Sequence, residues 1–242
     1  MSDNFFSKIS GNNVMTYEGA MQKIGILLGF TVISALFTSA YSLTALENGN
    51  VELLSALAMG GVICGFILAL IIYWTRPKNP VPLMMTYAIV EGVFIGAMST
   101  VMEHIFPGIV IQAIIGTLAI FVSMYFLYAI RILRPTPTFN KIVTSLTASI
   151  MLLYVISFVI SLATPYEMPL LHSSSLMGIG LTVFILVVAA LNLIMDFGFI
   201  ERSVQNQTPK VGEWWGAFGM LITLIWIYIE VLRLLMKLRS RN

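Results

Sequence analysis

The sequence predicts an all-α membrane protein, a polytopic bundle of seven transmembrane helices. Of its 242 residues, 58% are hydrophobic and only 10% are charged, and the mean hydropathy is +0.93. Soluble domains carry about 25% charged residues, whereas a bilayer core of about 30 Å requires about 20 consecutive apolar residues per helix. Seven continuous runs of about this length follow one another: Ile24 to Leu46, Leu53 to Trp74, Leu83 to Met102, Ile109 to Ile130, Ile142 to Ala163, Leu176 to Phe199 and Ala217 to Met236. Barrel strands would instead alternate over about 10 residues.

The first run follows a polar amino-terminal segment, MSDNFFSKISGNNVMTYEGA. This segment lacks the short apolar core and small-residue cleavage site of a signal peptide, so we expect the first run to remain as a helix. The sequence therefore divides into an amino-terminal tail, residues 1–20, and a seven-helix transmembrane domain, residues 21–242.

The second and third runs carry small residues at every fourth position. Gly61 and Gly65 follow this spacing in the second run, and Gly92 and Gly96 follow it in the third. Such positions lie on one helix face and allow two helix backbones to approach closely. We expect a compact bundle rather than a wide pore.

All nine prolines fall between the seven runs, where a missing backbone donor is tolerated. They are Pro77, Pro80, Pro82, Pro107, Pro135, Pro137, Pro165, Pro169 and Pro209. None interrupts a run, which argues against transporters built on broken helices.

The distribution of Lys and Arg predicts a cytoplasmic amino terminus, because these residues gather in the tail and in alternate connections. The last run is the exception. If it crosses, the basic residues at its end lie outside, namely Arg233, Lys237, Arg239 and Arg241; if it dips and returns, they lie inside. The length of the run favours seven crossings.

Two acids, Asp196 and Glu230, lie inside the sixth and seventh runs. A carboxylate at the bilayer centre costs roughly 2.5 to 3.5 kcal/mol, so intramembrane acids are usually functional. Each also has a local explanation: Asn192 is one turn before Asp196, and Arg233 is three residues after Glu230. If instead the two acids face each other, they share a proton and titrate as a unit, which makes a pH sensor.

Glu91 lies in the middle of the third run. It either lines the same bundle interior as Asp196 and Glu230 or forms a hydrogen bond with a neighbouring Ser or Tyr. Arg76 closes the second run beside Tyr73 and Trp74, a pattern typical of a positively charged anchor at the membrane interface. Glu213, next to two tryptophans, is interpreted as part of an interface belt.

No motif of an enzyme is present, such as a Gly-rich phosphate loop, an HExxH helix or a GxSxG elbow. The sequence predicts no cofactor, and a net charge of +2 gives no indication of nucleic-acid binding. His104 and His172 lie in predicted loops without other metal-ligand residues nearby.

Five stretches carry a family resemblance: YAIVEGVFIGAMS, GIVIQAIIGT, LNLIMDFGFIE, EWWGAFGMLITLIWIYIEVLRLL and its basic continuation MKL. Together they resemble the Bax inhibitor-1 family, in particular its bacterial YccA-like branch, over essentially the whole chain from about Met15.

The resemblance implies six helices around a central seventh, and a pH-sensitive leak of Ca²⁺. In the family this leak is governed by two hydrogen-bonded aspartates in the sixth and seventh helices, with an arginine latch at the end of the second. Carried over by position, the acids become Asp196 and Glu230 and the latch becomes Arg76. This sequence departs from the pattern in having Glu at the second position.

The leading hypothesis is a calcium or other cation leak across a bacterial plasma (inner) membrane, gated by Asp196 and Glu230. Glu91 and Asn192 are candidate pore-lining residues, since hard cations prefer oxygen ligands. The alternative, from a different functional class, is a regulatory partner that modulates a membrane-bound protease.

Overall fold

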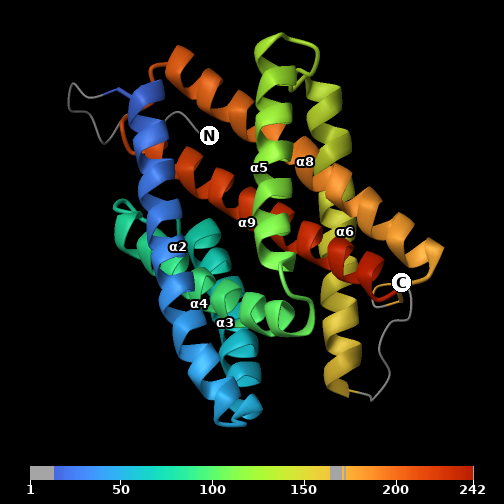
Figure 1. Ribbon diagram of the computed structural model, residues 1–242. Helices are drawn as coiled ribbons and strands as arrows, with labels where there is room; N and C mark the ends of the chain where they lie inside the picture. The colour runs from blue at the N-terminus through green and yellow to red at the C-terminus, as the bar shows by residue number, and fades with distance from the viewer. Residues whose placement is uncertain (1–13, 164–170, 172, 242) are drawn as a thin grey trace. The chain divides into compact units, whose positions relative to one another are not determined.

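The computed structural model describes residues 14–163, 171 and 173–241, apart from the side chains of residues 51 and 162. Within these ranges the regular structure consists of seven long helices and one isolated antiparallel β-bridge, between Val14 and Pro209. The helices are α2 (Tyr17–Glu47), α3 (Val51–Thr75), α4 (Val81–Ile105), α5 (Ile109–Ala129), α6 (Pro137–Ala163), α8 (Leu176–Gln205) and α9 (Gly212–Arg239) (Figure 1). All seven are long and apolar enough to cross a membrane, which confirms the predicted all-α class.

The chain forms two compact units. The first comprises Met1–Pro107 and Phe199–Leu221, and the second comprises Gly108–Gly198 and Ile222–Asn242. Helices α2, α3 and α4 therefore belong to the first unit, and α5 and α6 belong to the second. Both α8 and α9 contribute residues to each unit.

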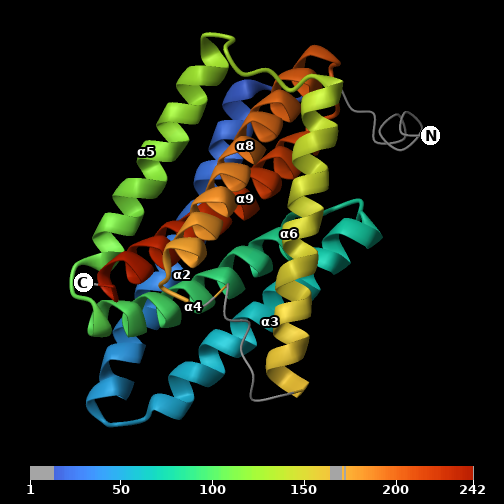
Figure 2. The same ribbon diagram turned by 90° about the vertical axis from the view of Figure 1, so that its right-hand side faces the viewer.

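In the first unit, α4 packs against α2 through its small residues (Figure 2). A Cβ atom added at Gly92 would overlap the carbonyl oxygen of Thr31 and lie 2.6 Å from the Cβ of Ser34. A Cβ added at Gly96 would lie 2.9 Å from the Cβ of Thr38. The predicted close approach at Gly92 and Gly96 is confirmed.

Glycines also allow α3 to approach α4 closely. A Cβ added at Gly61 would lie 2.7 Å from the Cβ of Phe94, and one at Gly65 would overlap the carboxylate of Glu91. Because both glycines are buried while Cys64 between them is exposed, the small-residue face of α3 is the face that meets α4.

In the second unit, an aromatic cluster fixes α5 against α8. The ring of Phe197 lies 5.7 Å from those of Phe121 and Tyr125 and 5.5 Å from that of Tyr128, in the tilted or edge-on geometries that aromatic pairs prefer. Gly116 allows α5 to approach Val231 of α9, whose Cγ1 would lie 2.9 Å from an added Cβ.

The described prolines lie outside the helices or in a first turn, as predicted. Pro82 and Pro137 occupy the first turns of α4 and α6, where the missing N–H needs no helical partner. Pro165 and Pro169 lie outside the described residues.

Several helices extend beyond the apolar runs. Helix α2 begins at Tyr17, seven residues before the predicted start, because the Thr16 side chain accepts a hydrogen bond from Gly19 N at 2.9 Å and caps the helix. Apolar runs report the hydrocarbon-spanning part of a helix, whereas caps determine where the helix ends.

Helix α9 is continuous over 28 residues, roughly 42 Å at 1.5 Å per residue. It contains no turn at which the last segment would dip and return. Half of its most apolar stretch is buried, the largest share among the seven helices.

Candidate functional site

Three polar residues of α9 form a stripe, defined here as Thr223, Glu230 and Lys237. They are spaced seven residues apart, so they lie two turns from one another on one face of the helix. All three are buried in surroundings that are otherwise largely apolar. Each has a hydrogen bond to a different partner in the second unit.

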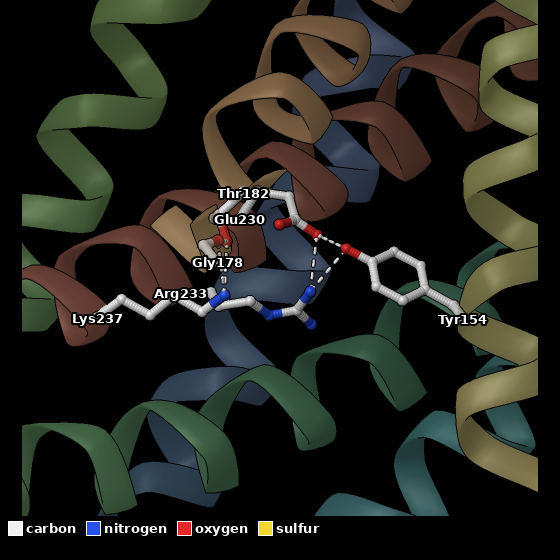
Figure 3. Close-up of polar contacts among 6 residues, drawn as sticks. All are labelled: Tyr154, Gly178, Thr182, Glu230, Arg233 and Lys237. Carbon is white, nitrogen blue, oxygen red and sulfur yellow. Dashed lines mark hydrogen bonds and ion pairs between the residues drawn. The ribbon is translucent and has the colours of Figure 1, made fainter. Parts of the chain in front are cut away.

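Glu230 is held by α6 and by its own helix (Figure 3). The hydroxyl of Tyr154 donates to Glu230 Oε1 at 2.5 Å. Arg233 Nη1 donates to Tyr154 Oη at 2.6 Å and to Glu230 Oε1 at 3.3 Å. The Glu230 side chain is 1% exposed and that of Arg233 is 28% exposed. Short contacts of this kind to a carboxylate are among the stronger hydrogen bonds of proteins.

The second carboxylate oxygen of Glu230, Oε2, is also buried but has no hydrogen-bond partner within the described part of the chain. Nearly all buried polar atoms in proteins are hydrogen-bonded. Oε2 can therefore accept a proton or a donor without displacing Tyr154 or Arg233 from Oε1.

Lys237 ends the stripe and is only 1% exposed. Its Nζ donates to the carbonyl oxygen of Gly178 at 3.0 Å and to Thr182 Oγ1 at 2.9 Å (Figure 3). Both partners lie in the first two turns of α8. The basic residue that the sequence placed near an external tail thus points into the protein.

Asp196 of α8 is hydrogen-bonded to the side chain of Thr223, at the other end of the stripe. Its Oδ2 is buried and has no hydrogen-bond partner among the residues that the structure describes. Asn192, the local partner considered from the sequence, donates instead to Thr147 Oγ1 at 2.9 Å and to the carbonyl of Val188 at 2.8 Å.

These contacts define the register of α8 against α9. Asp196 meets Thr223 and Thr182 meets Lys237, so fourteen residues on one helix match fourteen on the other in antiparallel order. Glu230 then lies at the level of Ala189, seven residues or roughly 10 Å along the axis from Asp196. No hydrogen bond joins the two carboxylates in the described structure, whereas the local pair of Glu230 with Arg233 is present.

Comparison with known proteins identifies the family. The profile of the family described as Bax inhibitor 1 like matches residues 2–240. The chain belongs to the Bax inhibitor-1-like family. A search of curated proteins and a search of solved structures found no match. The family resemblance is confirmed, while assignment to the bacterial YccA-like branch stays a prediction.

In this family member Glu91 is buried in the first unit, between α3 and α4. Its carboxylate is hydrogen-bonded to the Tyr87 hydroxyl one turn earlier and lies against Gly65. Of the two alternatives considered for Glu91, the bond to a neighbouring tyrosine is therefore observed. Its role as a pore-lining residue stays a prediction.

Arg76 ends α3 in a left-handed conformation with φ 41°. Its exposed guanidinium lies 5.9 Å from the centroid of the Tyr73 ring. This geometry suits an interfacial anchor. The latch role that the resemblance implies stays a prediction.

The interpretation of Glu213 as part of an interface belt is wrong, because its side chain is fully buried. Glu213 Oε1 accepts hydrogen bonds from Thr16 N at 3.1 Å and Thr16 Oγ1 at 3.2 Å, and Oε2 lies 3.6 Å from Lys23 Nζ. Gly19 leaves the space that the carboxylate fills. Glu213 thus ties the start of α2 to the first turn of α9.

Sequence reasoning missed Tyr154 and Lys237 as members of the site. The signal that could have found Lys237 is its spacing of seven residues from Glu230, which places both on one helix face. Nothing in the sequence around Tyr154 distinguishes it from the other aromatic residues of the apolar runs.

Proposed function

We propose that this Bax inhibitor-1-like protein is a pH-sensitive cation leak pathway, with Ca²⁺ as the transported ion and Asp196 and Glu230 as its protonatable groups. The observation that carries the proposal is Glu230, a carboxylate 1% exposed inside a membrane-spanning helix, held through one oxygen and open to a proton at the other. An acid in this setting is costly, which makes a functional role the default expectation.

The cluster of Tyr154, Glu230 and Arg233 acts as the gate. When Glu230 is ionised, Tyr154 and Arg233 join it and connect α6 to α9. When Glu230 takes a proton, Arg233 loses its counter-charge. The positive charges of Arg233 and of Lys237, which lies two turns after Glu230, then remain on α9 without a negative charge between them. Because Arg233 is already partly exposed, it then moves toward water, and the contact of α6 with α9 weakens. Acidification therefore favours the leaking state.

Asp196 provides a second oxygen site along the same face. Its position roughly 10 Å from Glu230 makes two single-carboxylate sites rather than one shared site. Conduction requires binding weak enough for the ion to leave, and hard Ca²⁺ prefers carboxylate oxygens. Two separated acids suit a leak better than a tight calcium site.

The basic residues support an orientation. Arg233 and Lys237 contact groups inside the protein. Of the four basic residues near the end of the sequence, only Arg239 and Arg241 then count as external charges. The excess of Lys and Arg in the amino-terminal tail and alternate connections then favours a cytoplasmic amino terminus and a full seventh crossing. The resemblance to YccA-like proteins is the ground for proposing a bacterial plasma membrane.

The test is ion flux through the purified protein in liposomes that contain a Ca²⁺ indicator. Stepping the external pH downward should increase Ca²⁺ entry, and protein-free liposomes should show no such increase. The alternative, a regulatory partner of a membrane protease, predicts no flux at any pH. Absence of flux from correctly folded protein would refute the leak.

A further inference from the structure

Lys237 occupies a small site lined by oxygen atoms between the start of α8 and the end of α9. Its ammonium group contacts the carbonyl oxygen of Gly178 and the hydroxyl oxygen of Thr182. The Thr182 hydroxyl donates its own hydrogen to the Gly178 carbonyl at 3.0 Å, so its oxygen lone pairs are free to face the ammonium. A contact between Ser174 Oγ and Ser240 Oγ at 2.6 Å holds the same two chain segments together.

The charge of Lys237 has no acidic partner at ion-pair distance among the described residues. Glu230, the nearest acid along α9, is two turns away and is already bound by Tyr154 and Arg233. Buried charges are normally paired, because an isolated ion in a protein interior is costly. Here the contacts that stabilise the charge are the two neutral oxygens of Gly178 and Thr182.

Both ligands are neutral oxygens, the kind of atom that coordinates monovalent cations. Backbone carbonyl oxygens replace the hydration shell of K⁺ in selective channels, whereas Ca²⁺ sites usually include carboxylates, of which this site has none. We propose that the Lys237 ammonium is a tethered cation that fills a monovalent-cation site formed by Gly178 and Thr182, and that it keeps free cations out of this end of the α8–α9 face.

Removing the ammonium should open the site to K⁺. The test is thermal unfolding of purified Lys237→Met in KCl and in choline chloride at equal concentration, since the choline ion is too large for the site. At a K⁺ concentration about ten times the dissociation constant, K⁺ should raise the Tm of Lys237→Met by roughly 3 to 6 °C. Wild type should show no difference between the two salts, because its site is filled.

Three further variants make the result specific. Lys210→Met, which removes an exposed lysine, should behave like wild type. Lys237→Met combined with Thr182→Val removes one of the two oxygen ligands and should lose most of the K⁺ effect. Lys237→Gln, which removes the charge but keeps a polar side chain, should gain K⁺ stabilisation as Lys237→Met does.

Equal Tm values in both salts for Lys237→Met and Lys237→Gln would overturn the proposal. Failure of both variants to fold even when purified in KCl would also count against it, because K⁺ should then replace the missing charge. The leak consequence rests on the proposed function and is measured separately as K⁺ flux in liposomes, where Lys237→Met should exceed wild type. Stabilisation by K⁺ without flux would retain the site and refute the leak.

Discussion

The ion pair of Glu230 with Arg233 allows the energetics of the gate to be tested by a double-mutant cycle. Arg233→Met leaves a carboxylate that is 1% exposed with Tyr154 as its remaining donor. Removing one partner of a buried pair costs about 3 to 5 kcal/mol. Because the Arg233 side chain is 28% exposed in the folded protein, we expect a loss of about 3 kcal/mol, at the lower end of this range.

The second variant, Glu230→Gln, removes the charge but keeps an oxygen that accepts from Tyr154. Its cost should be about 1.5 to 3 kcal/mol, the value of a hydrogen bond to a charged group. In the double variant no buried charge remains unpaired, so its loss should be smaller than the sum of the single losses by about 2 kcal/mol.

The assay is equilibrium unfolding in mixed detergent micelles with increasing sodium dodecyl sulfate, followed by tryptophan fluorescence. Additive losses, within about 0.5 kcal/mol, would show that the two residues do not interact and would refute the gate geometry. Tyr154→Phe provides an independent check, because it removes the hydroxyl that contacts both groups and should cost about 1.5 to 3 kcal/mol.

Three further predictions concern packing and topology. Gly92→Ala should destabilise the protein by about 1 to 3 kcal/mol in the same assay, because its Cβ would overlap Thr31 of α2, whereas Gly25→Ala, with no atom within 4 Å of its added Cβ, should not; equal stability of the two variants would place Gly92 away from a helix contact. A cysteine added after Asn242 in a Cys64→Ser background should react with a membrane-impermeant thiol reagent in intact cells, and labelling only after lysis would contradict a seventh crossing. Glu213→Gln should lower stability more than Glu18→Gln, because Glu213 is buried against Thr16 and Lys23 while Glu18 is exposed; equal effects would show that the tether contributes little.

The sequence was sufficient to predict the helices because each apolar run had to satisfy its backbone internally in hydrocarbon. The small residues at Gly92 and Gly96 also predicted a close helix contact, since only a missing side chain allows backbones to approach this closely. The helix ends were less predictable. Thr16 extends α2 and Glu213 binds its cap, a contact between residues almost two hundred positions apart.

The candidate site was predicted only in part. Asp196 and Glu230 stand out because acids are rare in apolar runs. The distance between them in the folded protein, however, depends on the register of α8 against α9. That register is set by Asp196 with Thr223 and by Thr182 with Lys237, pairs that composition and periodicity do not reveal. The choice of Tyr154 as the partner of Glu230 likewise depends on which face of α6 meets α9.

The most direct test of a leak gated by Glu230 is the pH dependence of Ca²⁺ flux in liposomes for Glu230→Gln beside wild type. Glu52→Gln, which changes an exposed glutamate, is the matched control. Wild type and Glu52→Gln should leak more as the pH falls, whereas Glu230→Gln, which mimics the protonated acid, should leak at a high and nearly constant rate. Asp196→Asn should lower the flux at every pH, because it removes an oxygen ligand from the pathway. A Glu230→Gln flux that follows the same pH curve as wild type would contradict the gate.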